Sequence, residues 1–335
     1  MSIKSKNILL GHGSGGKLTN DLINDIFIKK LSNKILSTLE DSAVIKNNKT
    51  RIAMTTDSYV VDPIFFPGGD IGRLCVCGTV NDISVSGATI CGISLGVIIE
   101  EGLDISILER IVESIKKTSK EAGVGIVTGD TKVVEKGKVD KIFINTAGVG
   151  FFDKDIDFSY KNVKKGDVII INGEVGSHGL AVLNERNNLG LCGDIKSDAA
   201  PLNGLISSIR EIKGIRCMKD LTRGGLLTAI NEISESAGVG AVIDENNVPV
   251  SRSVSSASDV LGLDPFYIAN EGKIVVVVDR KKADEVLSTM RRHKYGKKAS
   301  VIGSFTSDKA VMIRTSIGST RLAPMASGEQ LPRIC

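Results

Sequence analysis

Helix-like and strand-like patterns alternate along most of this chain, and that alternation restricts the possible folds more than any other feature. In "DISILERIVESIKKTSKEAG" apolar residues recur at Ile105, Leu108, Val112 and Ile115, a helical spacing that ends before Gly123. "KIVVVVDR" is instead a short apolar run of β-branched residues, which predicts a buried strand. We therefore predict an α/β or α+β fold, with helices packed on sheets.

Other segments follow the same two patterns. Helices are expected in "KLTNDLINDIFIKKLSNKIL", "LAVLNERNNL", "RGGLLTAINEISESAG" and "KKADEVLSTMRRH". Strands are expected in "TRIAMTTDSYVV", "DVIIING", "VGAVIDE", "KASVIGSF" and on both sides of the turn "EKGK" in 124–150.

The length of 335 residues predicts two domains rather than one. A polar, charged stretch, "FFDKDIDFSYKNVKKGD", interrupts the alternation and marks the boundary. We place an N-terminal domain at 1–152, a C-terminal α/β domain at 153–321 and a mobile tail at 322–335.

Charge and composition exclude some function classes. The net charge is only +4, the basic residues are scattered, aromatic residues make up 4% and Trp is absent, so no nucleic-acid surface is expected. The first residues contain too short an apolar run for a signal peptide or a membrane span. Six cysteines without paired CxxC spacing indicate reduced thiols and a cytoplasmic protein.

The segment "GHGSGGKLT" nearly matches the phosphate-binding P-loop, but Leu18 stands where a hydroxyl residue should bind magnesium. Three interpretations stay open: a true P-loop, a mobile glycine-rich segment that approaches phosphate through backbone N–H groups and Lys17, and a flexible terminus.

Aspartates recur at the ends of apolar runs, beside small or hydroxyl residues. A carboxylate in such a place must cap a helix, accept hydrogen bonds or bind a cation. A single one, such as Asp82, fits a helix cap or a turn, but several together are typical of Mg²⁺ that holds a polyphosphate. The set is Asp41, Asp57, Asp82, Asp130 and Asp220.

Four further polar residues have an ordinary and a functional interpretation. Lys132, Arg223 and Glu271 fit surface ion pairs, although Glu271 precedes a glycine and an apolar strand, a place where active sites are often found. His178 in "GSHG" fits a loop or helix cap, a metal ligand or a base.

The ending "GEQLPRIC" suggests either no function, an intermolecular disulfide, a lipid site or a thiol carried on an arm. Prenylation requires a cysteine four residues from the end, which excludes that lipid route for Cys335. We expect Pro332 to stiffen the arm, the α-carboxylate to raise the pKa of the Cys335 thiol, and Arg333 to offset that rise.

The motifs "HGSGGK", "TTDSYVVDPIFFPGGDIG", "CGTVNDISVSGA", "TGDTKVVEKG", "DLTRGG", "NEGK" and "PRIC" together resemble the HypE family of hydrogenase expression/formation proteins, along essentially the whole chain. "DLTRGG" also occurs in the wider ATP-binding superfamily of aminoimidazole ribonucleotide synthetase and selenophosphate synthetase.

The resemblance implies an ATP-dependent carbamoyl dehydratase. The carbamoyltransferase HypF would load a carbamoyl group onto Cys335, dehydration would give a thiocyanate, and the HypC–HypD complex would accept the cyanide for [NiFe] hydrogenase. It also implies a cytoplasmic homodimer whose N-terminal domains share a barrel-like core, with ATP bound nearby.

The resemblance further implies three sets of site residues. Asp41, Asp57, Asp82 and Asp220 would bind Mg²⁺. Lys17, Asn81, Gly129, Asp130, Thr131 and Asn145 would bind ATP. Catalysis would fall to Cys335, Glu271 and Lys132, with either Glu271 or Lys132 as the base and the other as its charge partner.

Two alternatives remain at this point: another ATP-dependent synthetase or kinase of the same superfamily, and a non-enzymatic docking protein. A selenophosphate synthetase would carry a reactive cysteine near the glycine-rich segment, yet Cys75 is the first cysteine of this chain.

Overall fold

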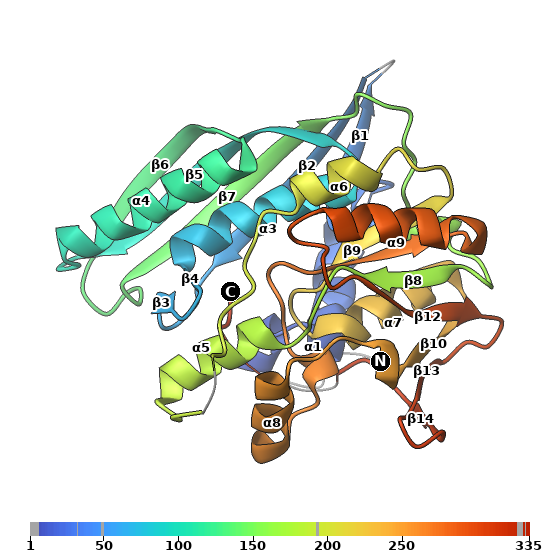
Figure 1. Cartoon of the computed structure of the whole chain (residues 1–335). Helices are drawn as coiled ribbons and strands as arrows, with labels where there is room; N and C mark the ends of the chain where they lie inside the picture. Colours follow the sequence, from blue (N-terminus) through green and yellow to red (C-terminus); the bar gives the residue numbers. More distant parts are fainter. Residues whose placement is uncertain (1–6, 32, 48–49, 192–193, 327–330, 332) are drawn as a thin grey trace.

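The computed structural model describes residues 7–31, 33–47, 50–191, 194–326, 331 and 333–335. They form two large sheets side by side, one from the N-terminal and one from the C-terminal half, with Cys335 between them (Figure 1). The α/β prediction is confirmed.

The N-terminal sheet is open and has the strand order β1-β2-β7-β5-β6. Its strands are β1 (Ala43–Asn47), β2 (Thr50–Tyr59), β5 (Thr89–Glu100), β6 (Ile126–Val134) and β7 (Ile142–Phe151). Strands were expected on both sides of the "EKGK" turn, and β6 and β7 are those strands. They are not neighbours, because β5 lies between them and pairs parallel with β6, which leaves β6 at the edge.

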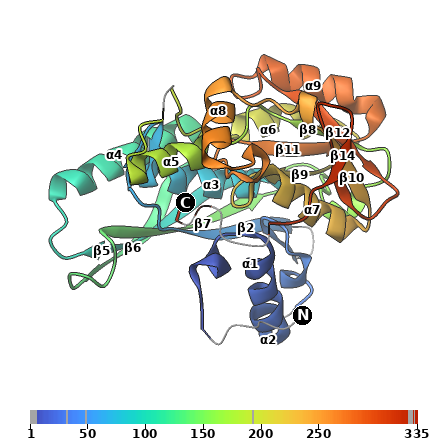
Figure 2. The same ribbon diagram turned by 90° about the horizontal axis from the view of Figure 1, so that it is seen from below.

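Helices α3 (Ile71–Val85) and α4 (Ile105–Ala122) cover one face of this sheet (Figure 2). Helix α4 is confirmed, and Gly123 ends it with a positive φ of 69°. The expected apolar face was partly wrong, because Ile105 and Val112 are exposed while Ile111 and Ile115 are buried. Helix α3 is buried on almost every side, so it lacks the amphipathic period by which α4 is recognised.

The opposite face of the sheet is largely uncovered in the single chain. Within the described part of the chain, only the N-terminal helical segment approaches it, near β2: α1 (Gly16–Leu22), the π-helical turn η2 (Ile23–Ile28) and α2 (Lys29–Leu31) (Figure 2). Apolar side chains are therefore left exposed on or near the edge strand, among them Val127 at 68% and Val133 at 66%.

The C-terminal sheet has the strand order β14-β13-β10-β12-β8-β11-β9. Its strands are β8 (Val168–Ile171), β9 (Ile215–Asp220), β10 (Gly240–Asp244), β11 (Ile274–Val278), β12 (Ser300–Thr306), β13 (Val311–Arg314) and β14 (Thr320–Leu322). Its helices are α5 (Ser177–Asn187), α6 (Asn203–Ile209), α7 (Gly225–Ala237), α8 (Arg252–Leu261) and α9 (Ala283–Arg292). All helices and strands that the sequence predicted in this half are present, and β11 is completely buried, as its apolar run indicated.

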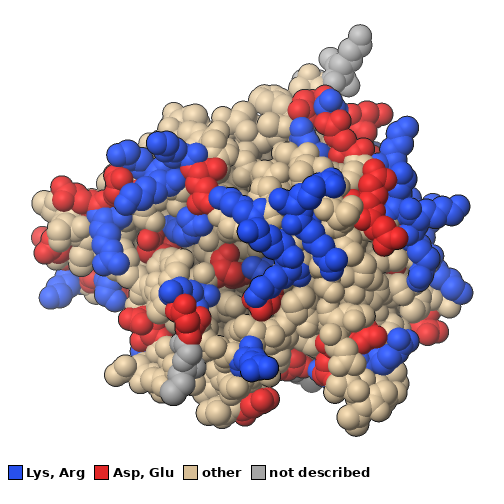
Figure 3. Space-filling model, in the orientation of Figure 1, with Lys and Arg blue, Asp and Glu red and all other residues tan. Residues whose placement is uncertain are grey.

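Acidic and basic side chains are interspersed over the face seen in Figure 3. In the part of the chain that the structure describes, no helix has the length and apolar character needed to cross a membrane. The five described cysteines are free thiols. The cytoplasmic location stays a prediction.

Candidate functional site

The described residues 333–335 at the end of the chain lie between the two sheets (Figure 1), and hydrogen bonds from both halves of the protein hold their backbone. The carbonyl of Cys335 accepts a hydrogen bond from the N–H of Val60, just after β2, at 3.0 Å. Residues Leu331 and Ile334 are buried in the core shared by α3, α5 and the N-terminal sheet. The tail thus places Cys335 at the junction of the two halves (Figure 1).

Three of the predicted aspartates come together at this junction. Asp57 lies on β2, Asp82 on α3 and Asp220 at the end of β9. Helix α3 is fixed on the sheet by a 2.6 Å hydrogen bond between the hydroxyls of Thr79 and Thr146, and the Thr55 hydroxyl on β2 donates to Asp82 at 2.9 Å. The Asp82 interpretation as a cap or turn residue is wrong, since Asp82 lies inside α3.

The pKa values of these carboxyls report their crowding. Burial, followed by repulsion from Asp57, Asp220 and Asp41, raises the pKa of Asp82 well above its usual value. Burial and then the charge of Asp41 raise the pKa of Asp220 to about 8. Burial also raises the pKa of Asp57, although Arg223 opposes the shift. A cation bound among these groups would relieve the repulsion.

Asp41, before β1, joins the group through Lys219 of β9. The Lys219 ammonium contacts Oδ1 of Asp41 and also pairs with Glu232 at 3.3 Å. Asp41 raises the pKa of Lys219 well above its usual value against the opposing effect of burial. Oδ2 of Asp41 is buried and has no hydrogen-bond partner among the described residues, as expected for an oxygen kept free for another ligand.

These residues fit a magnesium site that a bound nucleotide completes. Among the described residues, no three carboxylate, thiol or imidazole groups converge closely enough to hold an ion by themselves. Mg²⁺ normally takes one or two carboxylates and fills its octahedron with water and phosphate oxygens. The free oxygen of Asp41 and the crowded group of Asp57, Asp82 and Asp220 suit that arrangement.

Cys335 lies within the influence of both Glu271 and Arg223. Burial raises the pKa of its thiol to about 12, Arg223 lowers it, and Glu271 raises it again. The expected rise is present, but burial is its main cause. The expectation that Arg333 offsets the rise is wrong, because the Arg333 guanidinium turns away to the carbonyl of Val60 and to Asp140, both at 2.9 Å. Pro332 is outside the described residues.

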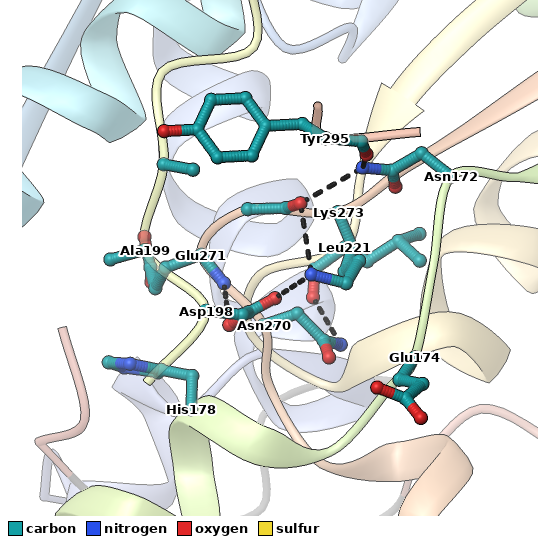
Figure 4. Close-up of polar contacts among 12 residues, drawn as sticks. Asn172, Glu174, His178, Asp198, Ala199, Leu221, Asn270, Glu271, Lys273 and Tyr295 are labelled. Carbon is teal, nitrogen blue, oxygen red and sulfur yellow. Dashed lines mark hydrogen bonds and ion pairs between the residues drawn. The ribbon is translucent and has the colours of Figure 1, made fainter. Parts of the chain in front are cut away.

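Glu271 is buried just before β11, and its backbone is held from several sides (Figure 4). Its N–H donates to Asp198 at 3.1 Å, and Asp198 forms a buried ion pair with Lys273 at 2.7 Å. Asn172 donates to the carbonyl of the following Gly272 at 3.1 Å. Burial raises the pKa of Glu271 well above its usual value, and the charges of Asp220 and Asp198 raise it further. Glu271 therefore has a carboxyl of high proton affinity on a well-held backbone, close enough to Cys335 to raise the pKa of its thiol.

His178 contacts the tail directly. It lies in the first turn of α5 and is completely buried, with Nε2 at 2.7 Å from the carbonyl oxygen of Ile334 and Nδ1 at 2.9 Å from the Ser197 hydroxyl. It is therefore not an exposed loop residue, and both of its ring nitrogens have protein partners.

The glycine-rich segment lies against Arg223. It forms the 3₁₀ turn η1 (Leu10–Gly13) and helix α1, and the described residues just before it, 7–9, do not form the strand that a P-loop requires, which argues against the P-loop interpretation. Arg223 donates to the carbonyl of Gly13 at 2.9 Å. A Cβ on Gly15 would come within 2.9 Å of the Arg223 Cβ, and the positive φ of 81° also favours glycine there. The Lys17 backbone N–H donates to the carbonyl of Ala326 at 2.8 Å.

Some predicted residues lie apart from this group. Lys132 and Asp130 form a 2.7 Å ion pair on the edge strand β6, which also carries Gly129 and Thr131. No contact between Lys132 and Glu271 is found among the described residues, so one chain does not bring these two catalytic candidates together.

Two predicted nucleotide-binding amides have protein partners. Asn81 is buried in α3. Its Oδ1 accepts a hydrogen bond from the N–H of Leu202 at 2.7 Å, and its Nδ2 donates to the carbonyl of Ala200 at 3.1 Å. Asn145 is exposed on β7 and donates to the carbonyl of Asp57 at 2.9 Å. Their roles in binding ATP stay predictions.

Sequence reasoning missed three residues of the site: Lys219, Asp198 and Tyr59. Lys219 directly precedes Asp220, and a lysine inside an otherwise buried strand is a signal of a paired charge. Asp198 lies in a segment without periodicity, and Tyr59, at 3.4 Å from Asp57, lies inside a predicted strand, so neither had such a signal.

Comparisons with known proteins identify the family of the chain. The family model of the AIR synthase related protein N-terminal domain matches residues 39–152, and that of the C-terminal domain matches residues 164–315. The "Carbamoyl dehydratase HypE" of Escherichia coli (strain K12) is 43% identical over 334 residues, which cover 98% of this chain and 99% of that protein.

Solved structures show the same fold over the same length. A chain of a HypE–HypF complex has a TM-score of 0.88 and 46% identity, over 91% of this chain and 99% of that one. A hydrogenase maturation protein HypE in complex with ATP has a TM-score of 0.82 and 45% identity, over 98% of this chain and 100% of that one. With its two matched domains and near-complete coverage of these relatives, the chain belongs to the HypE family of carbamoyl dehydratases, within the AIR synthase related proteins.

Proposed function

We propose that this protein uses ATP to dehydrate a carbamoyl group carried on the Cys335 thiol, which yields a thiocyanate for the cyanide ligand of [NiFe] hydrogenase. The observation that carries the proposal is the position of Cys335, beside Glu271 and Arg223 and within the influence of the magnesium-type carboxylates. Another synthetase or kinase of the superfamily would have no use for a cysteine held there.

The chemistry accounts for these residue types. An amide oxygen is a poor leaving group until it takes the γ-phosphoryl group of ATP, with ADP as the first product. Two protons then leave the nitrogen, the C–O bond breaks with release of phosphate, and the S–C≡N group remains. The site must therefore hold a polyphosphate, neutralise its charge and accept protons close to the sulfur.

We assign the proton acceptor to Glu271. Its raised pKa makes it a stronger base than an ordinary carboxylate, and the fixed backbone around it keeps the side chain in place. Lys132, exposed on β6, stays the alternative base or charge partner, and it would require a second chain or a movement to reach the thiol.

ATP and Mg²⁺ would be held by the carboxylates of Asp41, Asp57, Asp82 and Asp220. When Mg²⁺ is bound, it would neutralise the charge of the phosphates. Nucleotide binding by Lys17, Asn81, Gly129, Asp130, Thr131 and Asn145 is carried over from the family resemblance and remains part of this proposal.

We further propose three interactions. HypF would load the carbamoyl group, since a relative has been solved as a HypE–HypF complex. The HypC–HypD complex would accept the cyanide.

A second copy of this chain would cover the open face and edge of the N-terminal sheet, where Val127 and Val133 are exposed. Charged substitutions such as Val133→Asp should convert a dimer to a monomer in light scattering, and an unchanged mass would argue against this interface.

The central test is intact-protein mass spectrometry after incubation with the carbamoyltransferase, carbamoyl phosphate and ATP. We expect the mass of one carbamoyl group to be gained and then one water to be lost, the second step only with ATP. Cys335→Ala should gain nothing, whereas Cys91→Ser, at an exposed thiol away from the site, should behave as wild type.

Glu271→Gln should bind ATP and accept the carbamoyl group but stop before dehydration. Normal dehydration by this variant would remove Glu271 from the catalytic role.

A further inference from the structure

Helix α5 presents two polar side chains to the tail. His178 and Arg186 are eight residues apart, slightly over two helical turns, so both lie on the same side of the helix. Each contacts a main-chain carbonyl of the tail, His178 that of Ile334 and Arg186 that of Arg333.

His178 is held in one orientation and one tautomer. A carbonyl oxygen can only accept, so Nε2 carries the proton that it donates to Ile334 at 2.7 Å. Nδ1 is then the acceptor for the Ser197 hydroxyl at 2.9 Å. The ring of Phe66 lies edge-on to the imidazole at 5.6 Å between centroids. Burial lowers the pKa of His178, which favours the neutral ring that this arrangement needs.

Arg186 connects the tail to the N-terminal domain. Its Nη2 donates to the carbonyl of Arg333 at 2.5 Å, and its Nε donates to the carbonyl of Asp62 at 2.6 Å. The N–H of Asp62 also donates to the Arg333 carbonyl, at 3.3 Å. One guanidinium therefore joins α5, the tail and the chain segment after β2.

Apolar side chains of the tail determine which residues meet these donors. Leu331 and Ile334 are 7% and 4% exposed. Leu331 packs on α5 where Gly179 has no side chain, and a Cβ there would come within 2.8 Å of Leu331 Cδ1. Because both residues flank Arg333, a shift of the tail by one residue would expose them and remove the carbonyls from His178 and Arg186.

We propose that His178 and Arg186 are positioning residues that clamp the tail carbonyls and hold the Cys335 thiol at Glu271. They do not touch the reacting atoms. The catalytic meaning of the clamp depends on the proposed dehydratase function, but the clamp itself can be tested without that reaction.

The test measures how fast iodoacetamide alkylates Cys335 in the full-length chain. All proteins compared carry Cys91→Ser and Cys192→Ser, so that these two thiols do not react. The intact mass, followed over time, gives the alkylation rate. A net hydrogen bond contributes about 0.5–1.5 kcal/mol, so His178→Ala and Arg186→Ala should each raise the rate about two- to tenfold. The matched control is Glu185→Ala, an exposed residue of the same helix, which should leave the rate unchanged.

A rescue variant separates positioning from a general structural role. In His178→Gln the side-chain amide can still donate to the Ile334 carbonyl, so its alkylation rate should return toward wild type, whereas His178→Ala should stay fast. Wild-type alkylation rates in both alanine variants, with unchanged melting temperatures, would overturn the proposal. If His178→Ala does not fold, Arg186→Ala and His178→Gln decide in the same way.

This assay uses no ATP and no carbamoyl group. Failure of the dehydratase function would therefore appear in the mass-gain experiment, and failure of the clamp only in the alkylation rates.

Discussion

Arg223 and Cys335 are electrostatically linked at the junction of the two halves. Arg223 is the group that lowers the pKa of the half-buried Cys335 thiol, and Cys335 in turn is the largest influence that raises the pKa of Arg223. A thiol must ionise to attack a carbamoyl donor or an alkylating reagent, and this guanidinium favours the ionised form.

Replacement of Arg223 should therefore suppress thiol reactivity. In Arg223→Gln the pKa of Cys335 rises further, and the alkylation rate of Cys335 at pH 8 should fall about tenfold, the effect expected for loss of a close opposite charge. Arg223→Lys is the matched control, because it keeps the charge and should lose much less. Equal rates in wild type and Arg223→Gln would show that Arg223 does not support the thiolate.

Magnesium should compete with protons at the aspartates. The pKa of Asp220 is raised to about 8 from 3.8, so its contribution to stability is fully present below about pH 4 and is lost as the pH rises through 8. In EDTA the melting temperature should fall by roughly 4 °C between pH 6 and pH 9, and MgCl₂ should restore it at the higher pH. Asp220→Asn removes the titrating group and should flatten the profile. A magnesium effect that is the same at pH 6 and pH 9 would contradict this linkage.

Asp198 should set the pH dependence of the proposed base. Asp198→Asn keeps an oxygen for the N–H of Glu271 but removes a negative charge that raises the pKa of Glu271. The acid limb of the pH profile of the single-turnover dehydration rate should therefore move to lower pH by about 1 unit. Asp194→Asn, at an exposed carboxylate paired with Lys196, is the control and should leave the limb in place. An unmoved limb in Asp198→Asn would mean that Asp198 does not tune Glu271.

The predictions succeeded where structure follows from local pattern. The apolar run of β11 and the end of α4 before Gly123 each depend on residues that are adjacent in the sequence, and both are found as expected. Helix α3 was not recognised, because a helix buried on all sides has no polar face to mark its period. The buried face of α4 was also partly mispredicted, since Ile105 is as apolar as Ile111 and only packing distinguishes them.

The site residues divide in the same way, into those that the local sequence indicated and those that only the fold brought together. Asp57, Asp82 and Asp220 were selected from the sequence because a carboxylate beside an apolar run costs free energy to bury unless it has a partner such as a hydrogen-bond donor or a cation. The dependence of Asp41 on Lys219 and the placement of Glu271 by Asp198 were not visible, because each pair joins residues far apart in the chain.

The sequence by itself determined the alternating elements, the acidic residues of the site and the family, since each is written in residue types and short spacings. Only the tertiary structure decided where the tail lies and which groups surround Cys335. Arg223, rather than the neighbouring Arg333, supports the thiol, and His178 contacts the carbonyl of Ile334 in the tail. The reason is physical: pKa shifts and hydrogen bonds depend on distances and burial across the fold, and adjacency in the sequence does not fix either.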